Sequence, residues 1–130
     1  MRLRKATMKD ADFLLRLKND PEMRRFAVVT HKKIERKNHI NWLQDHFYEI
    51  WIIINKEKRA GMFRISIDKE VSINLSPKSR GKGIGSKVLK KCPKGVWAKI
   101  VNGNVASMRL FLNNGFKIVD YKENYYVLKN

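Results

Sequence analysis

This chain of 130 residues has few of the features that would cross-link it or hold it in a membrane. Its one cysteine, Cys92, excludes an internal disulfide and fits a reducing cytoplasm. None of its apolar runs approaches the roughly 18 residues of a membrane-spanning helix. The first residues, Met1-Arg2-Leu3-Arg4-Lys5, lack the apolar stretch of a signal peptide, and the histidines have no zinc-like spacing. We therefore expect a cytoplasmic protein with no metal and no membrane partner.

Acidic residues are scarce as well. The chain has 12 Asp and Glu against 29 Lys and Arg, and its formal net charge is +17. Such a charge attracts polyanions, either nucleic acid or a nucleotide-bearing substrate or cofactor. The basic residues are scattered, apart from the pairs at 32–33 and 90–91, so a solvated lysine-rich surface explains them too. The length and the 43% hydrophobic content predict one globular domain, residues 1–130.

The order of the elements predicts an α/β (α+β) fold, with a mixed, mostly antiparallel sheet and helices on both faces. Apolar runs predict strands at 2–6, 47–55, 60–67, 70–75, 96–101, 116–121 and 125–128. One helix is expected after a capping box of Thr7 and Asp10, and another from an N-cap at Thr30 to about residue 45. The apolar run at 50–54 predicts a central strand covered on both faces.

A glycine-rich basic turn, Arg80-Gly81-Lys82-Gly83-Ile84-Gly85, links the strand ending at Leu75 to a helix. Glycines let the backbone approach a ligand closely, and a helix N-terminus presents N–H groups to a phosphate. Lys78, Arg80 and Lys82 add positive charge around the turn. The spacing fits neither the Walker loop nor the dinucleotide fingerprint. The turn therefore predicts a cradle for a small phosphorylated cofactor.

A second informative segment runs from Asn104 to Phe116. Asn104 is a good helix N-cap, and Asn114-Gly115 is a helix stop that precedes a new strand. Between them, Ala106, Leu110 and Phe111 can share a buried helix face. Taken alone, the segment is an ordinary amphipathic helix with a glycine C-cap.

Together, and in this order, the two segments resemble the GNAT superfamily of N-acetyltransferases. Arg80, Gly83 and Gly85 fit the pattern [QR]-x-x-G-x-[GA] of its acetyl-CoA pyrophosphate loop, and residues 104–116 fit N-x-x-[AS]-x-x-x-[YF]-x-x-x-G-F. The likeness covers residues 7–116 in layout. It implies a GNAT-like fold and an enzyme, an acetyl-CoA-dependent N-acetyltransferase. Such an enzyme moves an acetyl group directly to a primary amine and uses acetyl-CoA as co-substrate.

The resemblance also implies where acetyl-CoA binds. A bulge beside Leu75 is expected to free backbone N–H groups, and the N–H of Ile73 takes the place where relatives polarise the thioester carbonyl. The implied cofactor-binding residues are Ile73, Leu75, Arg80, Gly81, Lys82, Gly83, Ile84, Gly85, Ser86, Asn104, Ser107 and Phe111.

One residue departs from the family pattern. Many relatives carry a tyrosine close to the coenzyme sulfur, and here that position is Phe111, which cannot donate a proton. Ser107, one helical turn earlier, is the candidate substitute as general acid. Otherwise water protonates the thiolate, or the thiolate leaves unassisted.

Two residues are candidates for the general base. Glu35, His39, Trp42 and His46 recur at helical spacing and therefore share a face. This face can line an acceptor pocket, with His39 as the base and with Glu35 and Trp42 in contact with the substrate; the alternative is a surface face with a packed tryptophan. Glu70, at the start of the strand that leads to Leu75, is the other candidate, since some relatives use a glutamate near there.

Short motifs point to the amine acceptor. Asn19-Asp20-Pro21-Glu22-Met23-Arg24 followed by His39-x-x-Trp42 resembles the bacterial branch that acetylates nucleotide-linked amino sugars, which places Arg24 in the substrate site. Protein N-terminal acetyltransferases of the ribosomal-protein type share a looser pattern and are the alternative. A non-enzymatic basic nucleic-acid-binding domain is the other alternative. We expect only weak, non-specific binding to nucleic acid, and the chain is compatible with a monomer or a homodimer.

Overall fold

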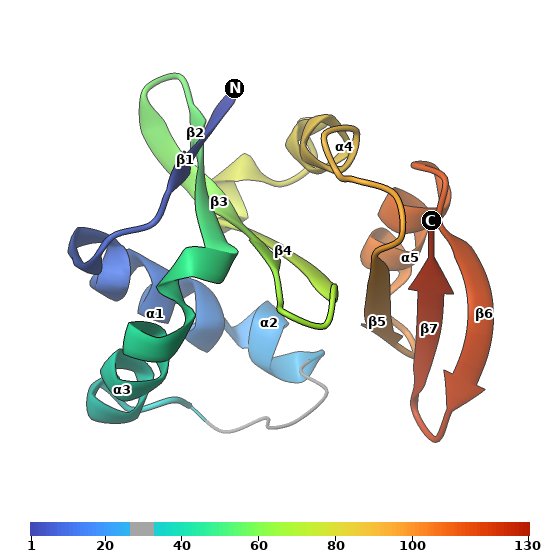
Figure 1. Ribbon diagram of the computed structural model, residues 1–130, viewed down its shortest axis with the longest axis horizontal. Helices are drawn as coiled ribbons and strands as arrows, with labels where there is room; N and C mark the ends of the chain where they lie inside the picture. Colours follow the sequence, from blue (N-terminus) through green and yellow to red (C-terminus); the bar gives the residue numbers. More distant parts are fainter. Residues whose placement is uncertain (27–32) are drawn as a thin grey trace.

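The computed structural model describes residues 1–26 and 33–130 and contains two antiparallel sheets flanked by helices (Figure 1). The first sheet has the strand order β1 (Arg2–Lys5), β2 (Ile50–Asn55), β3 (Lys58–Ile65) and β4 (Val71–Leu75). The second has the order β5 (Trp97–Val101), β7 (Tyr125–Lys129) and β6 (Lys117–Lys122). The predicted fold, mostly antiparallel sheet with helices on both faces, is confirmed.

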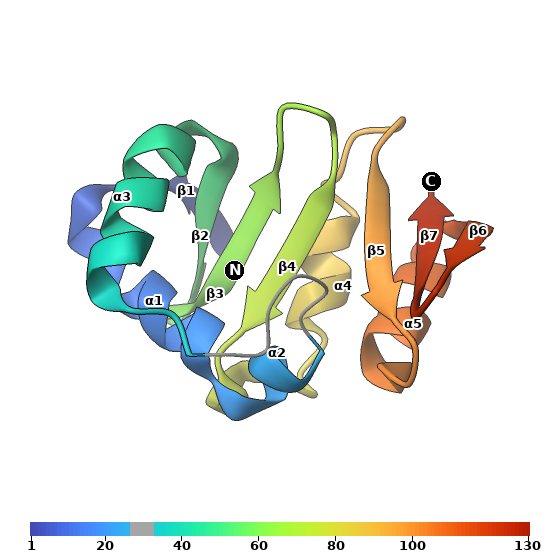
Figure 2. The same cartoon turned by 90° about the horizontal axis from the view of Figure 1, so that it is seen from below.

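The two sheets meet where β4 and β5 run parallel. A bridge between Glu70 and Trp97 joins them, and the Trp97 N–H donates to the Lys69 carbonyl at 3.1 Å. The Trp97 ring N–H also donates to the Asp68 carbonyl at 2.9 Å. These contacts lie at the amino-terminal ends of the strands, and Figure 2 shows that β4 and β5 diverge toward their carboxyl ends. The glycine-rich turn follows β4 at this diverging end.

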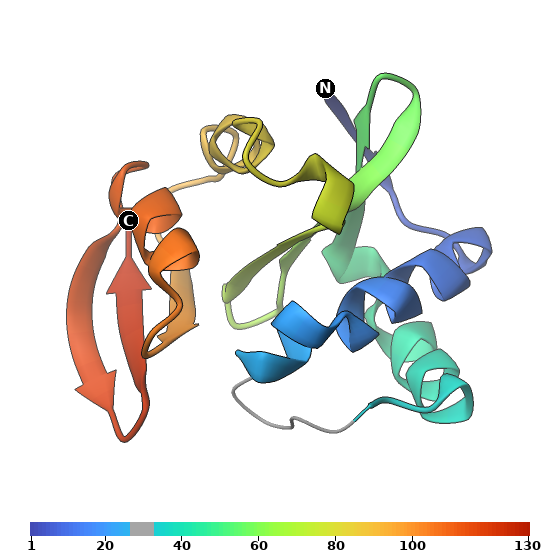
Figure 3. The same cartoon turned by 180° about the vertical axis from the view of Figure 1, so that it is seen from behind.

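Helices cover both sides of the first sheet (Figures 1 and 3). One side carries α1 (Ala11–Asn19), α2 (Pro21–Arg25) and α3 (Arg36–His46), and the other carries α4 (Ile84–Leu89), which packs with α5 (Val105–Leu112). Each side has its own apolar core. In β2, Ile52 belongs to the core under α1 and α3, whereas Ile53 belongs to the core with α4 and α5, and both are 0% exposed. The apolar run of β2 is therefore covered on both faces, as predicted.

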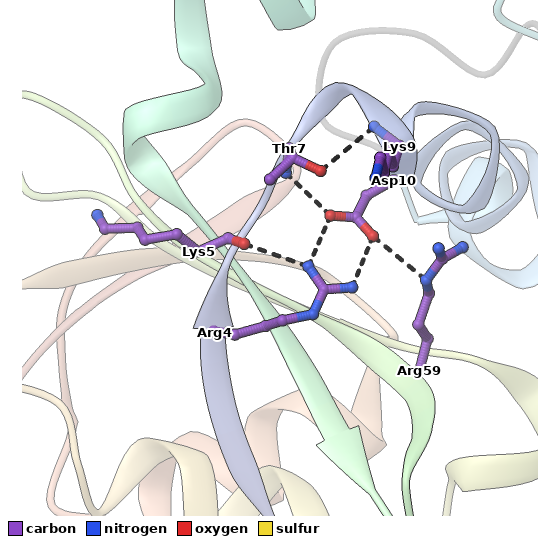
Figure 4. Close-up of polar contacts among 6 residues, drawn as sticks. All are labelled: Arg4, Lys5, Thr7, Lys9, Asp10 and Arg59. Carbon is purple, nitrogen blue, oxygen red and sulfur yellow. Dashed lines mark hydrogen bonds and ion pairs between the residues drawn. The ribbon is translucent and has the colours of Figure 1, made fainter.

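A buried carboxylate fastens the start of α1 to the sheet (Figure 4). Asp10 is 0% exposed and accepts two hydrogen bonds from Arg4 at 2.8 Å, together with an ion pair from Arg59 at 3.2 Å. It also accepts the N–H of Thr7 at 2.9 Å, while the Thr7 hydroxyl accepts the N–H of Lys9, which confirms the predicted capping box. Burial by itself raises the pKa of Asp10, but the bonds from Arg4 and Thr7 hold that pKa below its usual value.

Most strand boundaries differ from the predicted ones by one or two residues, as in β3, which spans Lys58–Ile65 instead of 60–67, and two element boundaries differ by more. The helix α3 begins at Arg36 with Glu35 as its N-cap, and the predicted N-cap, Thr30, lies outside the described residues. Strand β2 begins only at Ile50, because Phe47–Glu49 forms a 3-10 turn before it. Within residues 1–26 and 33–130, no helix has the length and apolar character to cross a membrane.

Candidate active site

Some backbone N–H groups of strand β4 point away from β3, its partner in the first sheet. The strand pairs with β3 in one uninterrupted register. The hydrogen bonds that flank this ladder, from the Ser66 N–H to the Glu70 carbonyl and from the Ser76 N–H to the Ala60 carbonyl, show that even-numbered residues bond to β3. The N–H of Ile73 therefore points to the other edge, where β4 and β5 diverge, and so does the N–H of the odd-numbered residue at 75. The predicted bulge is wrong, because a regular strand already presents these groups.

The glycine-rich turn is open on its outer side. Gly81, with φ 74°, and Gly83, with φ 78°, both have the left-handed backbone that glycine adopts without strain. A Cβ atom at either position would meet no atom within 4 Å. Gly83 is also the N-cap of α4, so the first N–H groups of this helix, which have no intrahelical partners, face the turn. The backbone of the turn is thus accessible to a phosphate group, as the sequence predicts.

The three residues that follow Gly83 are directed inward. Ile84 is 3% exposed, and a Cβ atom at Gly85 would lie 3.0 Å from the Leu110 side chain of α5. The Ser86 hydroxyl accepts a hydrogen bond from the Asn114 side chain at 3.1 Å. These residues therefore fasten α4 to α5 and to the core, and what they can offer a cofactor is their backbone N–H groups.

Arg80 holds the turn in position. Its guanidinium forms an ion pair with Asp20 at 2.9 Å, and its Nε donates to the Leu75 carbonyl at 3.2 Å. Arg80 thereby ties the turn to the end of β4 and to the corner between α1 and α2. Lys78 and Lys82 are exposed on the same turn, so they are the side chains available to add positive charge for a phosphate.

The helix α5 begins as predicted but buries its aromatic residue. Asn104 is the N-cap, and its Oδ1 accepts the N–H of Ser107 at 3.3 Å. Phe111 is 4% exposed and packs edge-on against Phe116, with 4.9 Å between the ring centroids. At the position where the sequence pattern expects a tyrosine beside the coenzyme, this chain has a core residue.

A cavity of about 200 Å³ lies on the side of the sheet that carries α1 and α3. Its lining comprises Leu14, Leu17, Lys18, Met23, His39, Trp42, Ile50, Met62, Arg64, Ser72, Ile73 and Asn74. Strand β4 thus borders the cavity, while its outer edge carries the N–H of Ile73.

Two residues of the predicted aromatic stripe of α3, His39 and Trp42, line this cavity, and His46 continues the stripe outside the lining. The ring centroids of His39 and Trp42 lie 6.4 Å apart, and those of Trp42 and His46 lie 4.3 Å apart, with the rings stacked in both pairs. Burial, together with the charge of Lys18, lowers the pKa of His39, so its ring is neutral at neutral pH. Glu35 is exposed at the N-cap and is not part of the lining, so its predicted contact with the substrate stays a prediction.

Two cations contact the Trp42 ring inside the cavity. The Lys18 Nζ lies 3.4 Å from the ring centroid, and the Arg64 guanidinium carbon lies 5.0 Å from it. Burial, and after it the charges of Arg64 and Arg24, lowers the pKa of Lys18 to about 8. Arg24, a predicted substrate residue, donates to the Lys18 carbonyl at 3.1 Å rather than lining the cavity.

Asn74 adds a buried acceptor. The residue is 7% exposed and its Nδ2 donates to the Leu17 carbonyl at 3.2 Å, whereas its Oδ1 has no hydrogen-bond partner in the described part of the chain. A buried acceptor without a partner costs roughly 1–3 kcal/mol, so Oδ1 marks a place for a ligand donor. The sequence did not single out Lys18, Arg64 or Asn74. Lys18 alone carried a signal, because it recurs on the apolar face of α1.

Glu70 lies at the junction of the two sheets. Burial raises the pKa of its half-buried carboxyl, and the charge of Lys99 opposes this shift. Strand alternation puts the Glu70 side chain on the same face of β4 as Ser72 and Asn74, which line the cavity. Neither Glu70 nor Ser107 is part of the cavity lining. Ser107, the predicted proton donor, lies on α5.

The chain matches a known family over most of its length. Residues 1–117 fit the acetyltransferase (GNAT) domain. The chain belongs to the GNAT acetyltransferase family. Enzymes of this family take their acetyl group from acetyl-CoA, so the chain is an N-acetyltransferase with acetyl-CoA as its co-substrate.

Solved structures share this fold. A domain from Methanocaldococcus jannaschii has a TM-score of 0.84 at 23% identity, over 99% of this chain and 96% of that chain. A ribosomal-protein-alanine N-acetyltransferase from Brucella melitensis has 0.80 at 19%, over 100% and 99%. A phosphinothricin acetyltransferase from Sinorhizobium meliloti, in complex with acetyl-CoA, has 0.79 at 16%, over 99% and 86%. At these identities the likeness concerns the fold alone, and no curated protein sequence matches the chain.

Proposed function

We propose that the chain transfers the acetyl group of acetyl-CoA directly to the primary amine of a small acceptor held in the cavity beside β4. One observation carries this proposal. Strand β4 borders the cavity with Ser72, Ile73 and Asn74, and its outer edge carries the N–H of Ile73 where β4 and β5 diverge. Strand β4 therefore contributes both to the place for an amine and to the place for a thioester, so the two reactants can meet at its diverging edge, as direct transfer requires.

The chain supplies the cofactor site mainly through its backbone. Acetyl-CoA, when bound, provides an activated acyl group. The N–H of Ile73 donates a hydrogen bond to the acyl carbonyl oxygen and stabilises the negative charge that develops there. The open turn at Gly81 and Gly83, with the first N–H groups of α4, holds the pyrophosphate. The further proposed contacts are Leu75, Arg80, Lys82, Ile84, Gly85, Ser86, Asn104, Ser107 and Phe111.

Glu70 is the proposed general base. An amine is protonated at neutral pH and must lose a proton before it attacks the thioester. Burial raises the pKa of Glu70, which makes its carboxylate a stronger base, and strand alternation continued to the residue before β4 directs its side chain to the cavity face. His39 is the second candidate, since its neutral ring lines the cavity and can accept a proton. Trp42, beside it, packs against the acceptor.

The departing thiolate lacks the tyrosine that many relatives carry at the position of Phe111. Phe111 carries no acidic proton and is buried against Phe116. We assign the role of proton donor to the hydroxyl of Ser107, which is half-buried one turn earlier on α5. Water is the alternative donor, and the Phe111→Tyr variant described in the Discussion tests how much protonation limits the rate.

For the acceptor we favour the amine of a nucleotide-linked amino sugar, with a protein N-terminus as the alternative. The Trp42 ring on the cavity wall suits a sugar ring, and the cations beside it suit a diphosphate. In this proposal the cavity of about 200 Å³ holds the amine-bearing sugar, with its diphosphate beside Lys18 and Arg64, and the nucleoside lies outside the cavity on the basic surface. A protein N-terminus would enter the same cavity with its first residue.

The family assignment argues against a purely nucleic-acid-binding role, which accounts for the charge of +17 but not for the site. We expect nucleic acid to bind weakly and in a strongly salt-dependent way. Residues 1–130 are proposed to act as one acetyltransferase domain in the cytoplasm, either as a monomer or as a homodimer.

Two measurements test the proposed function. Isothermal titration measures the affinity for acetyl-CoA, and a screen of primary amines measures the free thiol released on acetyl transfer. We expect acetyl-CoA to bind and thiol release to depend on the amine, with mass spectrometry detecting the acetylated product. A protein that does not bind acetyl-CoA, or that releases thiol at the same rate without any amine, contradicts the proposal.

A further inference from the structure

The cavity beside β4 has basic side chains in its lining, Lys18 and Arg64, and among the described residues no carboxylate joins them there. We propose that the acceptor amine carries an anionic group, a carboxylate or a phosphate, that binds beside Lys18 and Arg64 while the amine lies near β4. This inference rests on the proposed function and names the chemical class of its acceptor.

The charge of Lys18 is not balanced within the described protein. Arg64 has a partner, since it forms an ion pair with Glu49 at 2.6 Å, and Glu49 also contacts His46 at 2.9 Å. Around Lys18 the described residues provide no carboxylate within ion-pair distance, and its ammonium lies over the Trp42 ring instead. Burial and neighbouring positive charges already disfavour the charged form of Lys18. An anion in the cavity relieves both effects, because it supplies the missing countercharge.

Whereas Lys18 needs an anion, Asn74 needs a hydrogen-bond donor from a ligand. Its Oδ1 is a buried acceptor that needs a donor, and its Nδ2 is bonded to Leu17, the residue before Lys18. The cavity therefore has a place for an N–H group and a place for an anion in one small volume. A ligand that contains both groups satisfies both places, whereas an uncharged amine satisfies one. A polyamine brings a second positive charge toward Lys18 and Arg64 and is disfavoured by repulsion.

Matched acceptor pairs test this inference. Leucine is compared with leucinamide, and glucosamine 6-phosphate with glucosamine, so each pair differs in its anionic group; spermidine is the cationic control. In at least one pair we expect kcat/KM of the anionic member to exceed that of the neutral member by about tenfold or more, because contacts with a charged group are stronger than neutral ones. The pair that responds distinguishes a carboxylate from a phosphate.

Three variants assign the preference to Lys18. Lys18→Met removes the cation, Lys18→Arg keeps it, and Arg16→Met removes an exposed cation from the same helix. Lys18→Met should lower kcat/KM for the anionic acceptor about tenfold and change that for its neutral partner by less than about threefold. Lys18→Arg and Arg16→Met should keep most of the wild-type ratio. Because the ratio is compared between variants, differences in basicity between the amines cancel.

A binding measurement gives a readout without turnover. The same ligands are titrated into the protein saturated with CoA, and into the protein alone. The affinity for the anionic member should fall in Lys18→Met and should fall with added salt in the wild type.

Equal use of both members of each pair, a ratio unchanged in Lys18→Met, or a preference for spermidine would overturn the inference and leave acetyl transfer itself intact. Failure to bind acetyl-CoA, with no amine-dependent thiol release, contradicts the proposed function instead. In that case the titrations with leucine and glucosamine 6-phosphate still test the inference, because a cavity that binds neither anionic ligand contradicts it as well.

Discussion

The two sides of β4 offer different chemical groups, backbone on one side and side chains on the other. At the edge that faces β5, the proposed cofactor site consists largely of backbone, namely the N–H of Ile73 and the left-handed turn at Gly81 and Gly83. On the cavity face, the proposed acceptor site consists of side chains from separate elements, with Lys18 from α1 and His39 from α3. Both of these side chains have lowered pKa values.

This difference follows from what each site binds, because the cofactor is constant and the amine acceptor varies between enzymes. Acetyl-CoA is the same molecule for every enzyme that uses it, so strand edges, glycines and helix termini are sufficient to hold it. The amine differs between enzymes, and side-chain size and charge must select it. Changes at the cofactor edge should therefore alter acetyl-CoA affinity, whereas changes on the cavity face should alter turnover, acceptor preference and pH dependence.

The largest effect is expected for Gly83→Glu, which should abolish acetyl-CoA binding, because an anionic side chain would occupy a phosphate cradle. The backbone strain of a side chain at φ 78° contributes to the loss of stability. Gly95→Glu is the matched control, since Gly95 has φ 83° and equally open surroundings in another turn. Isothermal titration should show near wild-type affinity for that control. A folded Gly83→Glu variant with unchanged affinity would contradict the assignment of the cofactor site.

Glu70→Gln tests the cavity face and should lower kcat by about 10²–10⁴-fold, the usual contribution of a general base. The affinity for acetyl-CoA should stay unchanged, since the Glu70 side chain is directed to the cavity face of β4 and the cofactor is expected at the edge that faces β5. In the wild type, kcat/KM should rise with pH as the carboxyl loses its proton through its raised pKa, and this rise should disappear in the variant. If His39→Gln loses more activity than Glu70→Gln, then His39 is the base.

Lys18→Met should stabilise the fold at pH 7 by about 1–3 kcal/mol, because charged Lys18 is disfavoured by burial in the native state. The pKa of Lys18 is about 8 in the folded protein against 10.5 for an ordinary lysine, so the unfolded chain binds more protons between these values. The lysine therefore costs stability below pH 8, and the free energy of unfolding should rise with pH between 8 and 10.5.

Urea unfolding at several pH values measures this difference between the wild type and Lys18→Met. The gain in the variant should shrink as the pH rises through the same window. Lys87→Met, which removes an exposed lysine from α4, should change the free energy of unfolding by less than about 0.5 kcal/mol at each pH. A constant difference across the pH range would mean that Lys18 affects packing rather than charge.

The two sides of β4 also differ in how much of them could be predicted from the sequence. The capping box of Thr7, the N-cap at Asn104 and the open glycine turn were predicted correctly, because each is a local pattern with a local cause. The place of the Ile73 N–H was implied by the family resemblance and a bulge, and the direction of this N–H follows from the pairing of β4 with β3. A bulge was not needed, and the sequence had no means to exclude it.

The acceptor side could not be predicted in the same way. The bond from Asn74 to Leu17 joins residues 57 apart in the chain, and the pair of Arg80 and Asp20 joins residues 60 apart. No periodicity encodes such contacts, so Asn74 was missed, and so was the role of Arg80 as the anchor of the turn, beside its predicted contact with the cofactor. Glu35 is the N-cap of α3, so helical spacing, which holds from Arg36 onward, does not fix the direction of its side chain.

Phe111→Tyr should produce the smallest effect. It places a phenol where relatives carry one, and we expect thiol release to stay equal or to rise modestly. The change has a cost in packing, because Phe111 is 4% exposed and lies edge-on to Phe116. A hydroxyl buried without a partner should lower the free energy of unfolding by about 1–3 kcal/mol. If the phenol reaches the thiolate, kcat rises despite that loss, and proton donation was limiting. A sharp fall in kcat with intact acetyl-CoA affinity would mean that the ring packs against the bound acyl chain, and the account of a missing acid would then be wrong.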